Sequence, residues 1–264
     1  MNAAMKSVYF LMIIGLFSTV TGCNPFKSDH PQAEIADPYD TDLTAKTILQ
    51  YTATIDKNIP NYAKKSSLVY LLGDLSFFVE KFTQNGQTVL LVEHSFSGGS
   101  NKSLKSYYFR NDSVVLEKND SELANDGGKT YKNIRTFFRN NTIFKIENRT
   151  ATSVATINSL PYIDLPLSQN TTADQTHLSN VTALNDVVDG KDKFDMVFEN
   201  ITTYPDSRYI LLRSKIQNSY MASILVQDRD PFIDSLLNDP INFKDQKLNI
   251  SWIIKDHEAV YVPK

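Results

Sequence analysis

The sequence predicts an α+β protein in which an antiparallel β-meander with a covering helix is followed by a second, smaller β region. Three observations support this fold class. A helical pattern of apolar residues near the start of the chain gives way to alternating, β-prone runs. Those runs are separated by Asn-Gly and Asn-Asx pairs, which are typical of hairpin turns. The composition is that of an ordinary globular protein, with 41% hydrophobic and 22% charged residues.

The first 22 residues have the pattern of an export signal. Lys6 supplies a positive charge, and an uncharged apolar run follows from residue 8 to residue 20, too short to span a bilayer comfortably. The single cysteine of the chain, Cys23, comes directly after Val-Thr-Gly. Together these four residues resemble the lipobox of bacterial lipoprotein precursors. The resemblance implies a signal peptide over 1–22, fatty acyl chains such as palmitate on Cys23, and a membrane anchor through that lipid.

Residues 23–40 are polar and contain three prolines, which favours a flexible tether between the anchor and the folded part. Asn24 follows the lipidated cysteine. Enteric lipoproteins, which this segment resembles, follow a sorting rule. Under that rule, a residue other than Asp after the cysteine implies the outer membrane. We therefore expect a lipid-anchored protein of the cell envelope, at the outer membrane, facing the periplasm or the cell surface.

The folded part is expected to begin with a helix over 41–58. Thr44, Ile48, Tyr51 and Ile55 recur at helical spacing, Thr41 or Asp42 is the expected cap, and a proline at position 60 ends the pattern. This helix and the meander that follows it form the first predicted domain, over 41–155.

Hairpin signals dominate the rest of this domain. Asn85-Gly86 lies between two β-prone runs, and such a pair suits a type I′ turn because both of its residues need positive φ. Residues 108–115 resemble residues 137–144 at an offset of 29, since an aromatic pair and an arginine precede an Asn-Asp or Asn-Asn turn in each. We predict an antiparallel meander of about six strands over 65–155, with the first helix on one face.

A linker and a second helix are expected over 156–193, where an apolar stripe is ended by Gly190. Strands are then predicted at 194–204, 208–215 and 219–227, a helix at 231–238 with Ile233, Leu236 and Leu237 facing inward, and strands at 248–254 and 259–262. This β-β-β-α-β-β order resembles the OB-fold. The resemblance implies a small OB-like β-barrel over 194–264; a split barrel or a plain α+β sandwich fits the same order of elements.

Aromatic and arginine side chains near the repeated turns are the candidate ligand-binding residues. They are Tyr108, Arg110, Phe137 and Arg139. Aromatic rings beside a guanidinium can stack on a sugar ring or a base. The alternative interpretation is that these aromatic residues form the buried and half-buried faces of a sheet.

The sequence contains no catalytic or metal-binding motif to which a role can be assigned. Its four histidines lie in different contexts without metal-ligand spacing, and a lone cysteine cannot build a thiolate cluster. We therefore predict no catalytic residues, no metal and no cofactor. The net charge of −3, with 10 basic and 13 acidic residues from position 183 onward, argues against a nucleic-acid partner.

These observations favour a non-catalytic binding or scaffolding role, with a protein or glycan partner in the envelope. Two alternatives remain open at this point: a hydrolase acting on an envelope polymer, and an envelope inhibitor or immunity-type protein. A deep cleft with close carboxylates favours the enzyme. A shallow aromatic patch or an exposed sheet edge favours binding.

Overall fold

The computed structural model describes residues 43–167 and 172–263; the predicted signal peptide, Cys23 and the predicted tether lie outside these ranges. The elements of the first part are α2 (Ala45–Asn58), the 3-10 turn η1 (Ile59–Asn61), β1 (Ala63–Ser66), β2 (Tyr70–Leu72), β3 (Leu75–Gln84), β4 (Gln87–Ser97), β5 (Asn101–Arg110), β6 (Ser113–Asn125), β7 (Gly128–Arg139), β8 (Thr142–Ala151), α3 (Val154–Ser159) and β9 (Ile163–Leu165).

The elements of the second part are α4 (Thr172–Asp189), η2 (Asp192–Phe194), β10 (Met196–Thr203), β11 (Arg208–Ser214), β12 (Met221–Leu225), α5 (Pro231–Asn238), α6 (Pro240–Phe243), β13 (Ser251–Lys255) and β14 (Glu258–Val262). Among the described residues, no helix is both long enough and apolar enough to cross a bilayer.

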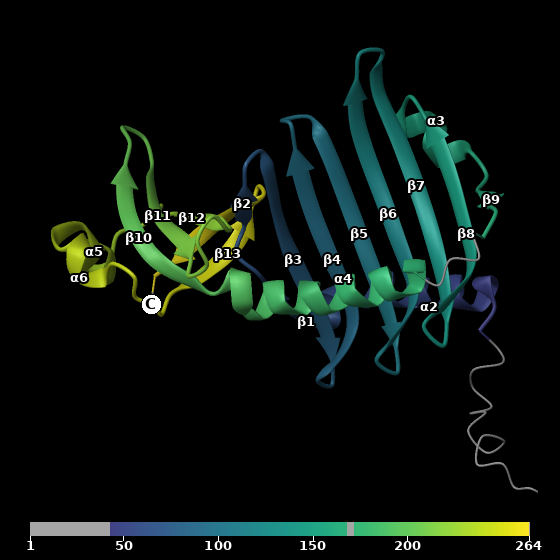
Figure 1. The fold of residues 1–264 in the computed structure, drawn as a ribbon, viewed down its shortest axis with the longest axis horizontal. Helices are drawn as coiled ribbons and strands as arrows, with labels where there is room; N and C mark the ends of the chain where they lie inside the picture. The colour runs from purple at the N-terminus through teal and green to yellow at the C-terminus, as the bar shows by residue number, and fades with distance from the viewer. Residues whose placement is uncertain (1–42, 168–171, 264) are drawn as a thin grey trace, which may run out of the picture. The chain divides into compact units, whose positions relative to one another are not determined.

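The described strands form one large, open and mostly antiparallel sheet (Figure 1). Strands β3 to β8 follow one another in the sheet, each antiparallel to the next. The three predicted turns are confirmed as hairpin turns, and both residues of each turn have positive φ: Asn85-Gly86, Asn111-Asp112 and Asn140-Asn141. Asn and Gly tolerate this left-handed conformation better than most residues, which is why the sequence signal was strong.

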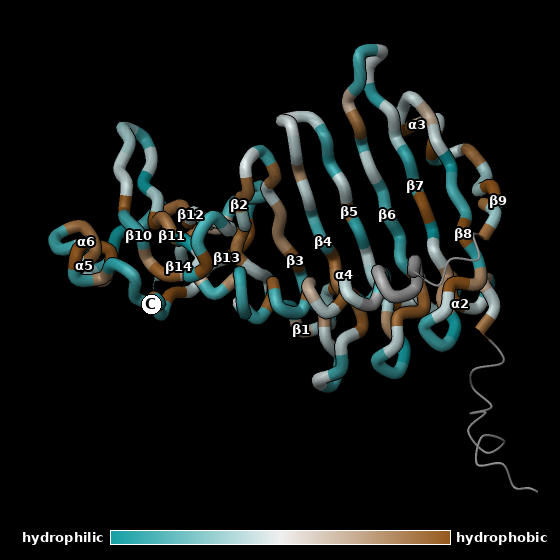
Figure 2. The backbone as a smooth tube through the Cα atoms, in the orientation of Figure 1, coloured by the Kyte–Doolittle hydropathy of each residue, from teal (hydrophilic) through white to brown (hydrophobic). Residues whose placement is uncertain are grey.

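Two helices cover opposite faces of this sheet. α4 packs through Leu184, Val187 and Val188 into one hydrophobic core, whereas α2 packs through Ile48 and Ile55 into a second. Because successive side chains of a strand point to opposite faces, the two cores lie on the two sides of the same strands. In Figure 1, α4 crosses the strands near the hairpin turns, and Figure 2 shows mostly hydrophilic residues where the strands extend beyond it.

The repeated aromatic pairs contribute to both cores. Tyr108 and Phe137 lie in the core under α2, while Phe109 and Phe138 lie in the core under α4. In each pair a β-bulge lies between the two aromatic residues, and an arginine then leads into the turn. The repeat therefore places one aromatic side chain on each face of the sheet.

The first helix begins slightly later than the predicted cap. Its N-cap is Thr44, whose hydroxyl accepts a hydrogen bond from the Thr47 amide at 3.2 Å, while the Thr47 hydroxyl accepts one from the Thr44 amide at 2.9 Å. This reciprocal pair satisfies two amides that the first turn leaves without a partner. Pro60 lies in the 3-10 turn that ends the helix, as expected.

The predicted closure of the C-terminal region into an OB-like barrel is not confirmed, because the sheet is open. β13 pairs with β14, and β14 pairs in parallel with β12. Among the described residues β10 pairs only with β11. The Phe198 amide and carbonyl on β10 instead bond to Gln246 and Asp245 at 2.8 and 2.9 Å, so the backbone groups needed for closure are used by a loop.

The strands of the two predicted domains are joined in one sheet. β2 pairs with β12, with Tyr70 opposite Ala222 and Leu71 opposite Met221. A single hydrophobic core continues from the strands under α4 to Ile233 and Leu236 of α5. The two β regions therefore share both hydrogen bonds and apolar packing.

The helix α5 provides a test of this packing. Its N-cap is Asp230, which accepts from the Ile233 amide at 2.9 Å, and its buried residues are Ile233 and Leu236, both 0% exposed. Leu237, also predicted to face inward, is only half-buried. We expect Leu236→Ala to lower the free energy of unfolding by about 2–5 kcal/mol, and Leu237→Ala by clearly less. Urea denaturation followed by circular dichroism measures both, and equal losses would contradict the observed orientation of the helix.

Candidate functional site

The four residues predicted to bind a ligand lie at the end of the sheet that α2 covers. Tyr108 and Phe137 are 3% and 0% exposed. The pKa of the Tyr108 hydroxyl is raised, first by burial and then by the carboxylate of Asp56, to which it donates a hydrogen bond of 2.8 Å. The interpretation of these aromatics as packing residues of the sheet agrees with this placement.

The two arginines lie close to aromatic rings of their own chain. The Arg110 guanidinium is 5.9 Å from the ring of Tyr51, and the Arg139 guanidinium is 4.7 Å from the ring of Phe144. Arg139 also donates a hydrogen bond to the Leu43 carbonyl. The Tyr51 contact links α2 to the sheet, and the Leu43 contact links the segment just before that helix to it. Ligand binding by the four residues, like lipidation of Cys23 outside the described residues, stays a prediction.

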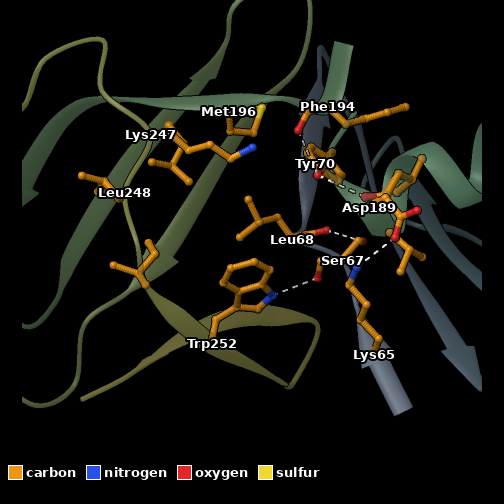
Figure 3. Close-up of a pocket in the computed structure, with 15 residues that line it drawn as sticks. Lys65, Ser67, Leu68, Tyr70, Asp189, Phe194, Met196, Lys247, Leu248 and Trp252 are labelled. Carbon is orange, nitrogen blue, oxygen red and sulfur yellow. Dashed lines mark hydrogen bonds and ion pairs between the residues drawn. The ribbon is translucent and has the colours of Figure 1, made fainter. Parts of the chain in front are cut away.

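A pocket of about 250 Å³ lies at the C-terminal end of α4 and is lined in part by residues of the core that this helix covers (Figure 3). Its wall comes from four parts of the chain: the segment from β1 to β2, the end of α4 with η2, the strands β10 and β11, and the segment leading into β13. The residues that line it are Lys65, Ser67, Leu68, Tyr70, Val187, Val188, Asp189, Gly190, Phe194, Met196, Leu212, Lys247, Leu248, Ile250 and Trp252.

A hydrogen-bonded contact fixes the side of the pocket formed by Ser67 and Trp252. Ser67 is 1% exposed; its amide donates to the Val79 carbonyl at 2.9 Å, and its hydroxyl accepts from the Val79 amide at 2.9 Å. The Trp252 indole N–H donates to the Ser67 carbonyl at 3.1 Å (Figure 3). The indole is thus held with its polar edge satisfied and its apolar surface toward the pocket.

Tyr70 connects this region to the end of α4. Its hydroxyl donates to the carbonyls of Val187 and Phe194, at 3.3 and 3.4 Å. Burial raises the pKa of this phenol strongly, and the nearby Asp195 raises it further. The residue therefore stays neutral and positions the helix end. Gly190, with φ of 62°, lets the chain leave the helix at this point.

The mouth of the pocket carries an excess of positive charge. Asp189 is paired with Lys65 at 2.9 Å and with Lys191 at 3.3 Å. Asp195 is paired with Lys215 at 2.6 Å and with Lys247 at 2.8 Å. Of these groups, Lys65, Lys247 and Asp189 line the pocket, so the lining has a net charge of about +1 at neutral pH; the other members of the ion pairs lie outside it.

Ion pairing lowers the pKa values of both of these carboxyl groups. Hydrogen bonding from Lys65 lowers the pKa of Asp189, and hydrogen bonding from Lys215 and Lys247 lowers the pKa of Asp195. A general acid needs the opposite shift, a raised pKa that keeps its proton near neutral pH. The apolar interior and the paired charges at its rim suit the binding of an amphiphilic group.

Metal binding has no support in the described part of the chain. Among residues 43–167 and 172–263, no three His, Cys, Asp or Glu side chains are grouped so that they could hold a metal ion. His177 pairs with Glu117, His94 pairs with Glu80, and the imidazole of His257 lies 4.6 Å from the Phe96 ring.

Sequence patterns did not identify the pocket. Its two mouth lysines, Lys65 and Lys247, are 182 positions apart in the chain and belong to no shared motif. The one usable signal was that Trp252 is the only tryptophan of the chain. A tryptophan between apolar residues of a predicted strand is more often a packing residue, so this signal alone does not indicate a site.

Comparison with known proteins gives no family for this chain: no family model, curated protein or solved structure matches it.

Proposed function

We propose that this chain is a lipid-anchored protein of the cell envelope with a non-catalytic binding role, and that its pocket takes the apolar chain of an anionic amphiphile. The observation that carries the proposal is the combination in one pocket of an apolar interior with a mouth of net positive charge. The lipobox resemblance at Cys23 supports the membrane location.

The interior of the pocket suits an aliphatic chain. Leu68, Leu248 and Trp252 face an open space, and transfer of a methylene group from water to such surroundings is favourable by about 0.8 kcal/mol. A ligand that is polar throughout gains nothing from these walls. An apolar ligand with a polar end can leave that end at the mouth.

The mouth favours a negative head group. Lys65 and Lys247 both line the pocket, and their side chains are 60% and 64% exposed. Their ammonium groups can contact a head group without losing all of their hydration. Lys65 and Lys247 each share an aspartate with a second lysine, so two ammonium groups lie near one carboxylate. The carboxylate or phosphate of a bound ligand reduces the repulsion between those ammonium groups.

The proposal can be tested with dodecanoate below its micelle concentration, titrated into the chain from Asn24 to Lys264. Trp252 is the only fluorophore of its kind and lies in the pocket wall, so its emission reports occupancy directly. We expect a saturable change of emission with dodecanoate and a weaker response with dodecyltrimethylammonium. Replacing Lys65 and Lys247 together by Met should weaken dodecanoate binding by about three- to tenfold, the range of exposed charge contacts.

Lys46→Met is the matched control, because Lys46 is an exposed lysine on α2. This variant should bind dodecanoate as the unmodified chain does. An emission spectrum that dodecanoate leaves unchanged would contradict the pocket assignment. An equal response to the anionic and cationic amphiphiles would contradict the role of the lysines.

A further inference from the structure

A second hollow lies on the face of the sheet that α2 occupies, where the strands extend beyond that helix. It is an open groove of about 390 Å³. Its floor is formed by side chains of β4 to β7, one wall by α3, and the other wall by the turn between β13 and β14. The groove is distinct from the pocket at the end of α4, since the two share no lining residue.

The strand register arranges the floor in two rows. Phe96, Lys102, Glu122 and Tyr131 are successive partners across four strands. One step along the same face, Leu104 and Asp120 lie opposite each other in the second row. Neighbouring strands are about 4.8 Å apart, so each row extends for roughly 14 Å. The first row thus has a lysine and a glutamate between two aromatic rings, and the second row has an aspartate beside a leucine.

His257 forms the wall at an unusual backbone position. It is the second residue of the turn between β13 and β14, with φ of 66°, and Asp256 before it has φ of 49°. Such a turn strongly prefers glycine at this second position. The His257 side chain at this position lies over the groove. The centre of its imidazole is 4.6 Å from that of the Phe96 ring and 6.3 Å from that of the Phe78 ring.

The charges of the floor are already balanced. Glu122 is paired with Lys129, Asp120 accepts a hydrogen bond from Asn133, and Lys102 adds one further positive charge. Two carboxylates therefore face two ammonium groups. Lys129 lowers the pKa of Glu122, which keeps this carboxylate ionised and able to accept hydrogen bonds. A strongly charged ligand gains little from such a surface.

The groove also excludes recognition by strand addition. Its floor is the middle of the sheet, where each of β4 to β7 has a paired strand on both sides. The backbone groups of these strands are used within the sheet, so a ligand can contact only side chains. Rings and aliphatic groups that alternate with planar hydrogen-bonding groups are suited to a sugar, which has apolar C–H faces and many hydroxyl groups.

We infer that this groove binds a short, uncharged oligosaccharide, with a sugar ring lying on the aromatic floor beside His257 and its hydroxyls bonded to the carboxylates of β6. The inference is independent of the proposed amphiphile site, because it rests on another face and other residues.

The test uses the full-length chain in phospholipid nanodiscs, titrated by calorimetry with the β-1,4-linked trimer of N-acetylglucosamine and with maltotriose. We expect saturable binding of at least one of these two sugars. His257→Gly should weaken it by about fivefold or more while leaving the fold intact, because Asp-Gly suits this turn better than Asp-His. Tyr131→Ala should weaken sugar binding to a similar extent, because Tyr131 lies at the other end of the row that begins at Phe96.

Asp112→Gly is the matched control, since it places glycine at the second position of another hairpin turn, where φ is 60°. It should leave sugar binding unchanged. The inference fails if neither trimer binds, or if His257→Gly binds the sugar as tightly as the unmodified chain. It also fails if an extended basic peptide binds in the groove and the sugars do not displace it.

Discussion

Replacing Val114 by Asp is expected to lower the free energy of unfolding by at least about 3 kcal/mol. Val114 is 7% exposed, pairs with Phe109 across the β5–β6 hairpin, and belongs to the core beneath α4. An aspartate there must either lose the hydration of its charge in an apolar core or take up a proton. Either change destabilises the folded state, because no partner in the core compensates for it. Urea denaturation should therefore show a midpoint at a much lower urea concentration.

The adjacent turn supplies the control for this experiment. Asn111 and Asp112 both have positive φ, and glycine adopts this conformation without a steric penalty. Replacing the pair by Gly-Gly should therefore change the free energy of unfolding by no more than about 1 kcal/mol. A tolerated Val114→Asp change, together with a damaging Gly-Gly change, would contradict the orientation of this hairpin.

Signals that depend on a few neighbouring residues predicted the local structure well. The three Asn-containing turns and the glycine that ends α4 were identified from the sequence, because each reflects a backbone conformation set within a few positions. The five strands of the C-terminal region were also predicted in their order along the chain, though not in their arrangement in the sheet. Such features need no knowledge of what lies across the sheet.

Pairing between distant strands could not be predicted in the same way. The edge of β12 pairs with β2, about 150 positions earlier in the chain, and with β14 further along the strand. The order of elements in 194–264 is compatible with a closed barrel, but closure depends on which edge meets which strand. No local sequence pattern shows that Ala222 pairs with Tyr70 and not with another residue of similar hydrophobicity.

The candidate sites show the same limit. Arginines beside aromatic pairs resemble a sugar-stacking surface in sequence, yet α2 covers the Tyr108 and Phe137 side chains. The pocket and the groove were not predicted, because each gathers residues from segments that are far apart in the chain. The role that we infer for His257 rests on its φ and its contact with Phe96 taken together, and neither can be read from the sequence.

Replacing Cys23 by Ala is expected to abolish anchoring through acyl chains. In the proposed lipoprotein this cysteine is the only attachment point for acyl chains, since the chain has no second cysteine. Each buried methylene of an acyl chain contributes about 0.8 kcal/mol, and stable anchoring needs more than one chain. Without the thiol, no thioether can form, and neither the folded part nor the tether replaces this contribution. The variant should remain unprocessed or be released.

Detergent phase partitioning of cell fractions measures this effect. The unmodified chain should enter the detergent phase, while a Cys23→Ala chain that has lost its leader should stay in the aqueous phase. Thr21→Ala is a suitable control, because it keeps a small residue within the lipobox-like segment and should be anchored normally. Mass spectrometry of the N-terminal peptide then settles the chemistry. An unmodified N-terminus at a position other than Cys23 would show that the export signal is an ordinary one, and that the protein reaches its ligands without a lipid anchor.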